Sequence, residues 1–107
     1  MTEGQKRENK VRFQGEISKE PRVFKGTEEP KNSIIKLFLK GDTKAGNVYM
    51  TVKIAGTLAE KLLDKVPTWK VGEEIIVEGE LDWESFEKDG KKQYSTRINA
   101  FQVYRVD

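Results

Sequence analysis

Aromatic and basic side chains lie close together in the last third of this chain. Trp83 and Phe86 come shortly before the dipeptide Asp89-Gly90, and Lys91 and Lys92 follow it. Aromatic rings stack on unpaired nucleic-acid bases, and ammonium groups contact phosphates. Because Asp-Gly favours a tight turn between two strands, the spacing places these side chains near the tip of a hairpin. The stretch indicates a contact with single-stranded nucleic acid.

The same stretch is strongly acidic. Between Glu73 and Asp89 there are eight carboxylates and one base, Lys88. The row Glu78, Glu80, Asp82 and Glu84 occupies alternate residues, which on a strand puts neighbouring carboxylates about 7 Å apart on one face. An acid/base pair or a metal site is one interpretation, but this spacing is too open for a compact metal cage. We therefore expect a solvated or partner-facing acidic strip.

The composition argues against catalysis. The chain has no Cys and no His, so it lacks the usual general base and the commonest metal ligands. It also has no GxxxxGK[ST] phosphate loop and no nucleophile elbow. We expect a protein that is not an enzyme and that holds no metal and no cofactor.

The charge is unevenly distributed, although the net charge is only +2. Residues 1–53 hold 12 Lys/Arg and 7 Asp/Glu, whereas residues 54–107 hold 8 and 11. The first half of the chain is therefore the one expected to contact phosphates of a nucleic-acid backbone. No apolar run approaches the roughly 20 residues of a membrane span, so we expect no membrane contact and a cytoplasmic, nucleoid-associated or virus-encoded protein. The basic candidates outside the hairpin turn are Lys10, Arg12, Lys36, Lys40, Lys53 and Arg97.

Period-two alternation of apolar residues predicts the strands that position these side chains. Strands are expected at residues 9–18, 32–40 and 48–55, with Phe38 and Tyr49 facing outward. Pro21 is expected to interrupt the first strand, and residues 26–31 to form a loop. Residues 41–47 are expected to form a turn between the second and third strands.

One helix is expected after the third strand. Thr57-Leu58-Ala59-Glu60 has the pattern of a capping box, and Leu58, Leu62, Leu63 and Val66 follow at helical spacing. Pro67 marks its end, giving a helix of about ten residues. Trp69, in the connector that follows, is expected to plug the bottom of a barrel.

The hairpin and a last strand, ending at Val106, complete the chain. Alternation predicts two inward-facing sets, Ile75, Val77, Gly79 and Leu81 on one arm and Tyr94, Thr96 and Ile98 on the other. Trp83 continues the first set, so packing and base contact both stay open for it. Phe101 is expected to be structural. The arms continue past the buried alternation, which predicts a hairpin that projects from the body.

Three strands, a helix and two strands predict an all-β protein, a five-stranded OB-fold barrel with one α-helix between the third and fourth strands. An open meander with one packed helix is the alternative. Residues 1–8 are expected to form a flexible N-terminal arm, and residues 9–107 a single OB-fold domain.

Three segments resemble those of bacterial and phage single-stranded DNA-binding proteins. They are Asn9-Lys10-Val11 with Gly15, Ile17, Pro21 and Val23; Ile54 to Glu60; and Val77 to Leu81 with Tyr94-Ser95-Thr96. The likeness covers residues 9–101 in the right order. It implies the OB fold, stacking of bases on Tyr49 and Phe86, phosphate contacts from Lys10 and Lys53, and a homo-oligomer, either a dimer or a tetramer.

The chain also departs from that family. Ala55 stands where the family uses a stacking aromatic, and Asp82 and Glu84 stand where it tends to carry basic residues. The family's acidic, Phe-ended C-terminal tail is not found before Asp107. These differences indicate a diverged member.

The function expected from these features is non-sequence-specific binding and protection of single-stranded DNA in replication, recombination or repair. The alternative is an OB-fold adaptor that contacts replication or recombination proteins and binds nucleic acid weakly; recognition of structured RNA or DNA junctions is a third. The expected DNA-binding residues are Tyr49, Phe86, Lys53, Lys10, Arg12, Lys36, Phe38, Lys40, Trp83, Lys91, Lys92 and Arg97.

Overall fold

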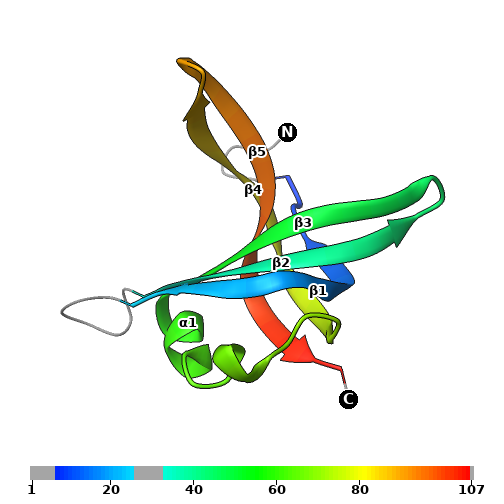
Figure 1. The fold of residues 1–107 in the computed structure, drawn as a ribbon, viewed down its shortest axis with the longest axis vertical. Coiled ribbons are helices and arrows are strands. Elements are labelled where there is room, and N and C mark those ends of the chain that lie inside the picture. Colours follow the sequence, from blue (N-terminus) through cyan, green and yellow to red (C-terminus); the bar gives the residue numbers. More distant parts are fainter. Residues whose placement is uncertain (1–6, 26–32, 107) are drawn as a thin grey trace.

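Five strands close into a barrel in the computed structural model, which describes residues 7–25 and 33–106. Around the barrel the strand order is β1-β2-β3-β5-β4; β3 and β5 pair in parallel and the other neighbours antiparallel. The strands are β1 Val11–Phe24, β2 Ile34–Thr43, β3 Gly46–Ala55, β4 Glu74–Lys88 and β5 Lys91–Arg105. Helix α1 (Gly56–Leu62) and the short 3₁₀ helix η2 (Val66–Thr68) connect β3 to β4 (Figure 1). The OB-fold prediction is confirmed. The predicted loop at residues 26–31 and most of the predicted arm at residues 1–8 lie outside the described residues.

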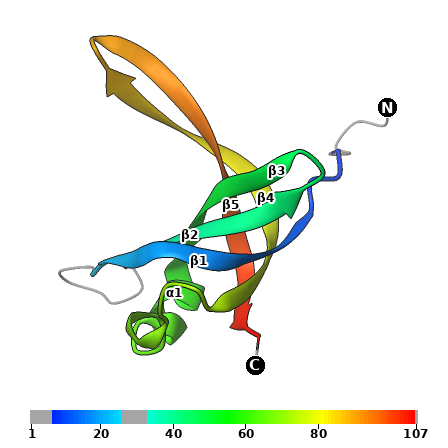
Figure 2. The same cartoon turned by 45° about the vertical axis from the view of Figure 1, so that its right-hand side comes forward.

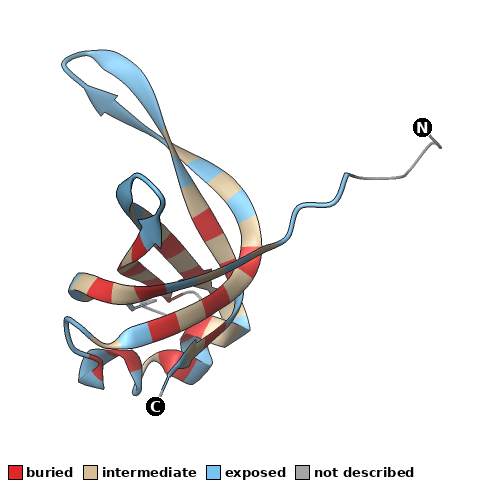
Figure 3. Cartoon of the chain, turned by 90° about the vertical axis from the view of Figure 1, so that its right-hand side faces the viewer, coloured by how far each residue is buried: buried red, intermediate tan, exposed pale blue. Residues whose placement is uncertain are grey.

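Inward-facing residues of every strand form the core (Figure 3). Ile35, Leu37 and Leu39 of β2 are fully buried, as the alternation predicted. Trp69 is 8% exposed and packs in the same core, which confirms its structural role. The remaining fully buried apolar residues are Ile17, Val52, Ile54, Ala59, Val66, Ile75, Val77 and Ile98.

Strand β1 is continuous through Pro21, so the predicted interruption was wrong. Irregular pairing with β2 around Lys19, on either side of which the register shifts, absorbs the distortion. At Gly15 the strand passes so close to β2 that an added Cβ would lie 2.8 Å from the Lys40 carbonyl oxygen. The absence of a side chain at this position therefore allows the close approach of β1 to β2.

The β2–β3 hairpin is longer than predicted. Gly41 pairs with Val48 and Thr43 with Gly46, so most of the expected turn at residues 41–47 is strand. Thr43 closes the remaining turn, because its Oγ1 donates to the Gly46 carbonyl at 2.8 Å and accepts from the Ala45 N–H at 3.2 Å. The hairpin extends away from the helix end of the barrel (Figures 1 and 2).

Helix α1 begins earlier and is shorter than expected. Its N-cap is Ala55, with no side-chain capping hydrogen bond, so the predicted capping box was wrong. Thr57 lies inside the first turn, where its hydroxyl cannot act as the N-cap. The α-helix ends at Leu62, and Pro67 lies in the first turn of η2.

Strands β4 and β5 continue past the barrel as a projecting arm (Figures 1 and 3), as predicted. Asp89 and Gly90 form its turn with φ of 54° and 75°, the signs of a type I′ hairpin turn. Leu81, Tyr94 and Thr96 are exposed on this arm, so their predicted burial was wrong. The alternation continues there, but no layer of protein covers it.

The base of the arm is held in two ways. The Asn9 amide donates to the Leu81 carbonyl and accepts from the Leu81 N–H, both at 2.9 Å. A register shift between Glu78 and Gly79 on β4 lets Gly79 pair with Ala100. This shift leaves Phe101 61% exposed, so the structural role predicted for Phe101 was wrong.

Candidate nucleic-acid interface

One outward surface crosses β2, β3 and β5, and we call it the outer face. The strand registers place Lys36 opposite Lys53 and Lys40 opposite Tyr49. Because paired residues point to the same side of a sheet, these side chains share this surface with Phe38, Thr51 and Arg97. The structure therefore brings together six predicted site residues: Lys36, Phe38, Lys40, Tyr49, Lys53 and Arg97.

Tyr49 is the most accessible aromatic ring of the outer face. Its side chain is 67% exposed and borders an open hollow of about 410 Å³, which Phe38 and Lys19 also line. The Lys19 ammonium lies 4.2 Å from the centroid of the Phe38 ring, a cation–π contact. Lys19 was not among the predicted site residues, because its place opposite Phe38 follows from the irregular β1–β2 pairing. The hollow offers ring surfaces for bases and an ammonium group for a phosphate.

The ammonium group of Lys40 is paired. Its Nζ lies 2.8 Å from Glu16 Oε1. The hydrogen bond to Glu16 and the attraction of its charge raise the pKa of Lys40. A phosphate that contacts Lys40 therefore competes with this carboxylate.

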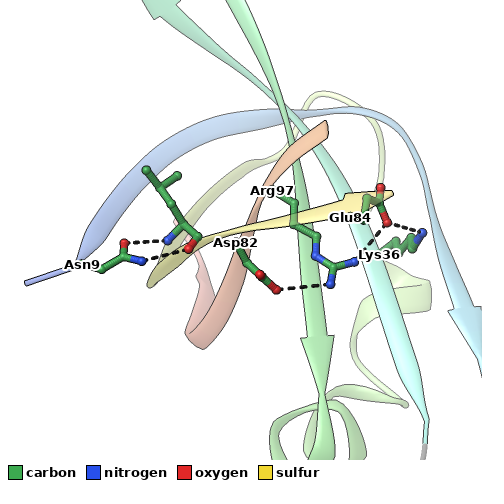
Figure 4. Close-up of polar contacts among 6 residues, drawn as sticks. Asn9, Lys36, Asp82, Glu84 and Arg97 are labelled. Atoms are coloured by element: carbon green, nitrogen blue, oxygen red, sulfur yellow. Dashed lines mark hydrogen bonds and ion pairs between the residues drawn. The ribbon is translucent and has the colours of Figure 1, made fainter. Parts of the chain in front are cut away.

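Arg97 is the centre of an ion-pair network where the arm leaves the barrel (Figure 4). Its guanidinium donates to Asp82 Oδ2 at 3.2 Å and to Glu84 Oε2 at 3.0 Å. Lys36 Nζ reaches the same Glu84 oxygen at 3.4 Å. The Arg97 side chain is 14% exposed, and its Nε has no hydrogen-bond partner in the described part of the chain.

This network corrects the prediction of a solvated or partner-facing acidic strip. Asp82 and Glu84 contact cations of the same chain. The pKa of Asp82 is lowered by a backbone hydrogen bond from Trp83 and then by the hydrogen bond from Arg97. Glu78, further along the row, accepts a hydrogen bond from the Tyr104 hydroxyl at 2.7 Å. Three carboxylates of the predicted row are therefore bound within the molecule.

The arm has two faces with different chemistry. The ion-paired face includes Asp82, Glu84, Phe86, Lys88, Lys91 and Arg97, and the aromatic face includes Leu81, Trp83, Glu87, Lys92 and Tyr94. On the aromatic face, the rings of Trp83 and Tyr94 lie 5.2 Å apart, centroid to centroid, in an edge-to-face arrangement. The Lys92 ammonium lies 5.9 Å from the centroid of the Tyr94 ring. The predicted arm residues are therefore divided between two opposite surfaces.

Tyr94 was missed as a candidate because alternation assigned it to the core. The Asp-Gly turn contains the signal that could have identified it. A two-residue turn at Asp89-Gly90 sets Tyr94 opposite Ser85 and therefore diagonal to Trp83.

Lys10 and Arg12 do not join the outer face. Lys10 lies 3.8 Å from Glu8, and Arg12 lies 3.6 Å from Glu78 at the β1–β4 pairing. A hydrogen bond involving Tyr104 is the main cause of the raised pKa of Arg12. Both basic residues line a separate hollow of about 450 Å³ beside the exposed Phe101 ring.

Within residues 7–25 and 33–106, no group of three or more Asp, Glu, His or Cys side chains is arranged to hold a metal ion. No helix in this described part is long and apolar enough to cross a membrane.

Comparison with known proteins identifies the family. A solved structure of a Plasmodium falciparum SSB in complex with ssDNA is similar to this chain, with a TM-score of 0.77 and 16% sequence identity. The alignment covers 97% of this chain and 99% of that one, which supports the OB fold. A search of curated proteins finds no match. The model of the single-strand binding protein family matches residues 8–106, and the chain therefore belongs to this family.

Proposed function

We propose that this protein binds single-stranded DNA without sequence preference and protects it during replication, recombination or repair. The observation that carries the proposal is the outer face, where the exposed ring of Tyr49, the half-buried ring of Phe38 and basic side chains from β2, β3 and β5 lie on one surface. Membership of the single-strand binding protein family supports it. The similar Plasmodium falciparum structure contains ssDNA.

Stacking and phosphate contact have separate residues in this proposal. Tyr49 and Phe38 stack bases on the barrel, and Phe86 stacks one on the arm; each base stacked on an aromatic ring contributes about 1–3 kcal/mol. Lys53 and Lys19 contact phosphates between these rings. The strand would run from the hollow beside Tyr49 toward the base of the arm.

The test is a titration of oligo-dT against intrinsic fluorescence at two salt concentrations. Binding is expected to quench fluorescence and to weaken with salt. The slope of log K against log salt concentration is expected to be about −0.7 for each phosphate neutralised. Tyr49→Ala is expected to weaken binding about tenfold, within the range for one stacked base. Phe101→Ala is the matched control, because Phe101 is exposed to a similar extent but lies on the separate hollow. Equal losses in both variants would contradict the proposed site.

A second candidate function is an adaptor that contacts other proteins. The aromatic face favours it, because Trp83 and Tyr94 are about 60% exposed in the single chain, at 59% and 62%. The same face is available to a second copy of the chain, as a homo-oligomer would require. Sedimentation across a concentration series, with Trp83→Ala beside wild type, tests the homo-oligomer. One stoichiometric protein partner, together with millimolar affinity for oligonucleotides, would favour the adaptor.

A further inference from the structure

Four charged side chains at the base of the arm neutralise one another. Lys36 comes from β2, Asp82 and Glu84 from β4, and Arg97 from β5. Arg97 bridges the two carboxylates, and Glu84 bridges the two cations (Figure 4). Two positive and two negative charges leave this site with no net charge, although it lies on the surface that otherwise suits phosphates.

The network is partly shielded from water. The four side chains are between 14% and 36% exposed, whereas Lys10 and Glu8 in the surface pair near the N-terminus are 81% and 77% exposed. Ion pairs that are partly buried are screened less by salt than exposed pairs. A phosphate that approaches Arg97 or Lys36 therefore has to displace a carboxylate that is already in position.

The two kinds of nucleic acid meet this obstacle differently. A single strand also presents unstacked bases, which the exposed ring of Tyr49 can bind. Bases in a duplex are stacked inside the helix, so a duplex offers this surface mainly phosphates. The free-energy cost of displacing the carboxylates therefore weakens the binding of a duplex more than the binding of a single strand.

We propose that Asp82 and Glu84 are selectivity residues: they occupy Arg97 and Lys36 and so exclude polyanions that offer phosphates without unstacked bases. The inference rests on the proposed function and adds how the protein distinguishes single strands from duplexes. The carboxylates act as internal substitutes for phosphate. Their removal should strengthen all polyanion binding, and duplex binding most.

The experiment compares wild type with Asp82→Asn/Glu84→Gln. Labelled oligo-dT and a labelled duplex of equal length are titrated separately and followed by anisotropy at two salt concentrations. The variant is expected to bind duplex about tenfold more tightly and oligo-dT about threefold more tightly. For the duplex, the slope of log K against log salt concentration should become steeper by about 1.8. The reason is that Arg97 and Lys36, freed from the carboxylates, each neutralise one phosphate and each contribute about 0.9.

Glu60→Gln/Asp64→Asn is the matched control. It makes the same change in charge at two exposed positions of the helical connection, away from the arm. If this control changes the ratio of duplex to oligo-dT affinity as much as the test variant does, the effect is one of general charge and the inference is wrong.

Other outcomes are equally decisive. Weaker binding of both probes by the test variant would show that the carboxylates position Arg97 for contact, which overturns the inference. Glu84→Gln alone keeps the Arg97–Asp82 pair, and it is expected to show about half the change in slope if the double variant is too unstable to titrate. If wild type binds oligo-dT but the double variant leaves the affinity ratio unchanged, only the inference fails. If wild type does not bind oligo-dT, the proposed function fails and the inference fails with it.

Discussion

The β4–β5 arm carries bound charges on one face and exposed aromatic rings on the other, although the same two strands build both faces. On the ion-paired face, Asp82 and Glu84 hold Arg97 within 3.2 Å. On the aromatic face, Trp83 and Tyr94 contact each other. Glu87 lies opposite Lys92 in the strand register, and the described part of the chain shows no ion pair for Lys92.

The difference follows from where each face points. The ion-paired face turns toward β2 and β3, which supply Lys36 and the neighbouring Lys53. The aromatic face has no strand beneath it, so the alternation that would build a core leaves rings in solvent. The same two strands therefore provide an ion-paired surface on one side and an apolar surface on the other.

The largest effect is expected from a substitution at the register shift between β4 and β5, on which both faces of the arm depend. In Gly79→Ala the added Cβ would collide with the Asn99 carbonyl oxygen at the register shift. We expect a loss of about 2–3 kcal/mol in the free energy of unfolding, measured in urea, because backbone cannot move aside easily. Ser85→Ala, on the same arm but exposed, should stay within about 0.5 kcal/mol of wild type. An unchanged urea midpoint for Gly79→Ala would show that the register is held elsewhere.

The next prediction separates the two faces by binding. Phe86→Ala is expected to weaken oligo-dT binding by about 1–3 kcal/mol, the range for one stacked base. Trp83→Ala should weaken it by less than about 1 kcal/mol, because Trp83 lies on the opposite surface of the arm. Fluorescence anisotropy of a labelled oligo-dT measures both variants. The reverse order of losses would place the strand on the aromatic face.

A smaller effect is expected where the arm joins the barrel. Asn9→Ala removes both hydrogen bonds to the Leu81 backbone and should reduce stability by about 1 kcal/mol. Amide exchange at Leu81 should become faster, while exchange in the core of β2 stays unchanged. Glu8→Ala, which alters the neighbouring exposed residue, is the control. Unchanged protection at Leu81 would mean that strand pairing alone holds the base.

The smallest expected effect is a pH dependence confined to the ion-paired face. The pKa of Asp82 is lowered by the Trp83 N–H and by Arg97, so its contribution to stability is present above the unfolded pKa of about 3.9. That contribution is lost as the pH falls through the lower pKa of the folded state. The difference in Tm between wild type and Asp82→Asn should therefore shrink below about pH 4. Tyr94→Phe, on the aromatic face, should show a constant difference over this acidic range; a parallel change in both would contradict the assignment.

Several features of the fold follow from short segments of sequence. The alternation of Ile35, Leu37 and Leu39 predicts a strand with one buried face, and these residues are fully buried. Asp89-Gly90 predicts a two-residue turn, and the positive φ angles at both positions agree. The capping-box pattern at Thr57 failed because the end of β3 leads directly into the helix at Gly56. Local chemistry was sufficient where no neighbouring element changed the boundary.

The candidate site was only partly predictable. The sequence identified outward rings such as Tyr49 and basic residues such as Lys53, because both belong to an alternation visible along one strand. It did not reveal that Lys36 and Glu84, 48 residues apart, would form an ion pair. It also did not reveal the exposure of Phe101, which depends on the register shift beside Gly79.

The sequence by itself therefore determined the family, the order of strands and helix along the chain, the alternation of buried residues and the turn at the tip of the arm. Only the tertiary structure decided which carboxylate pairs with which cation, and which aromatic rings remain uncovered. The physical reason is one of range. Alternation and turn preference act over a few neighbouring residues, whereas the ion pairs and the exposed rings depend on how separate strands coil and align around a closed barrel.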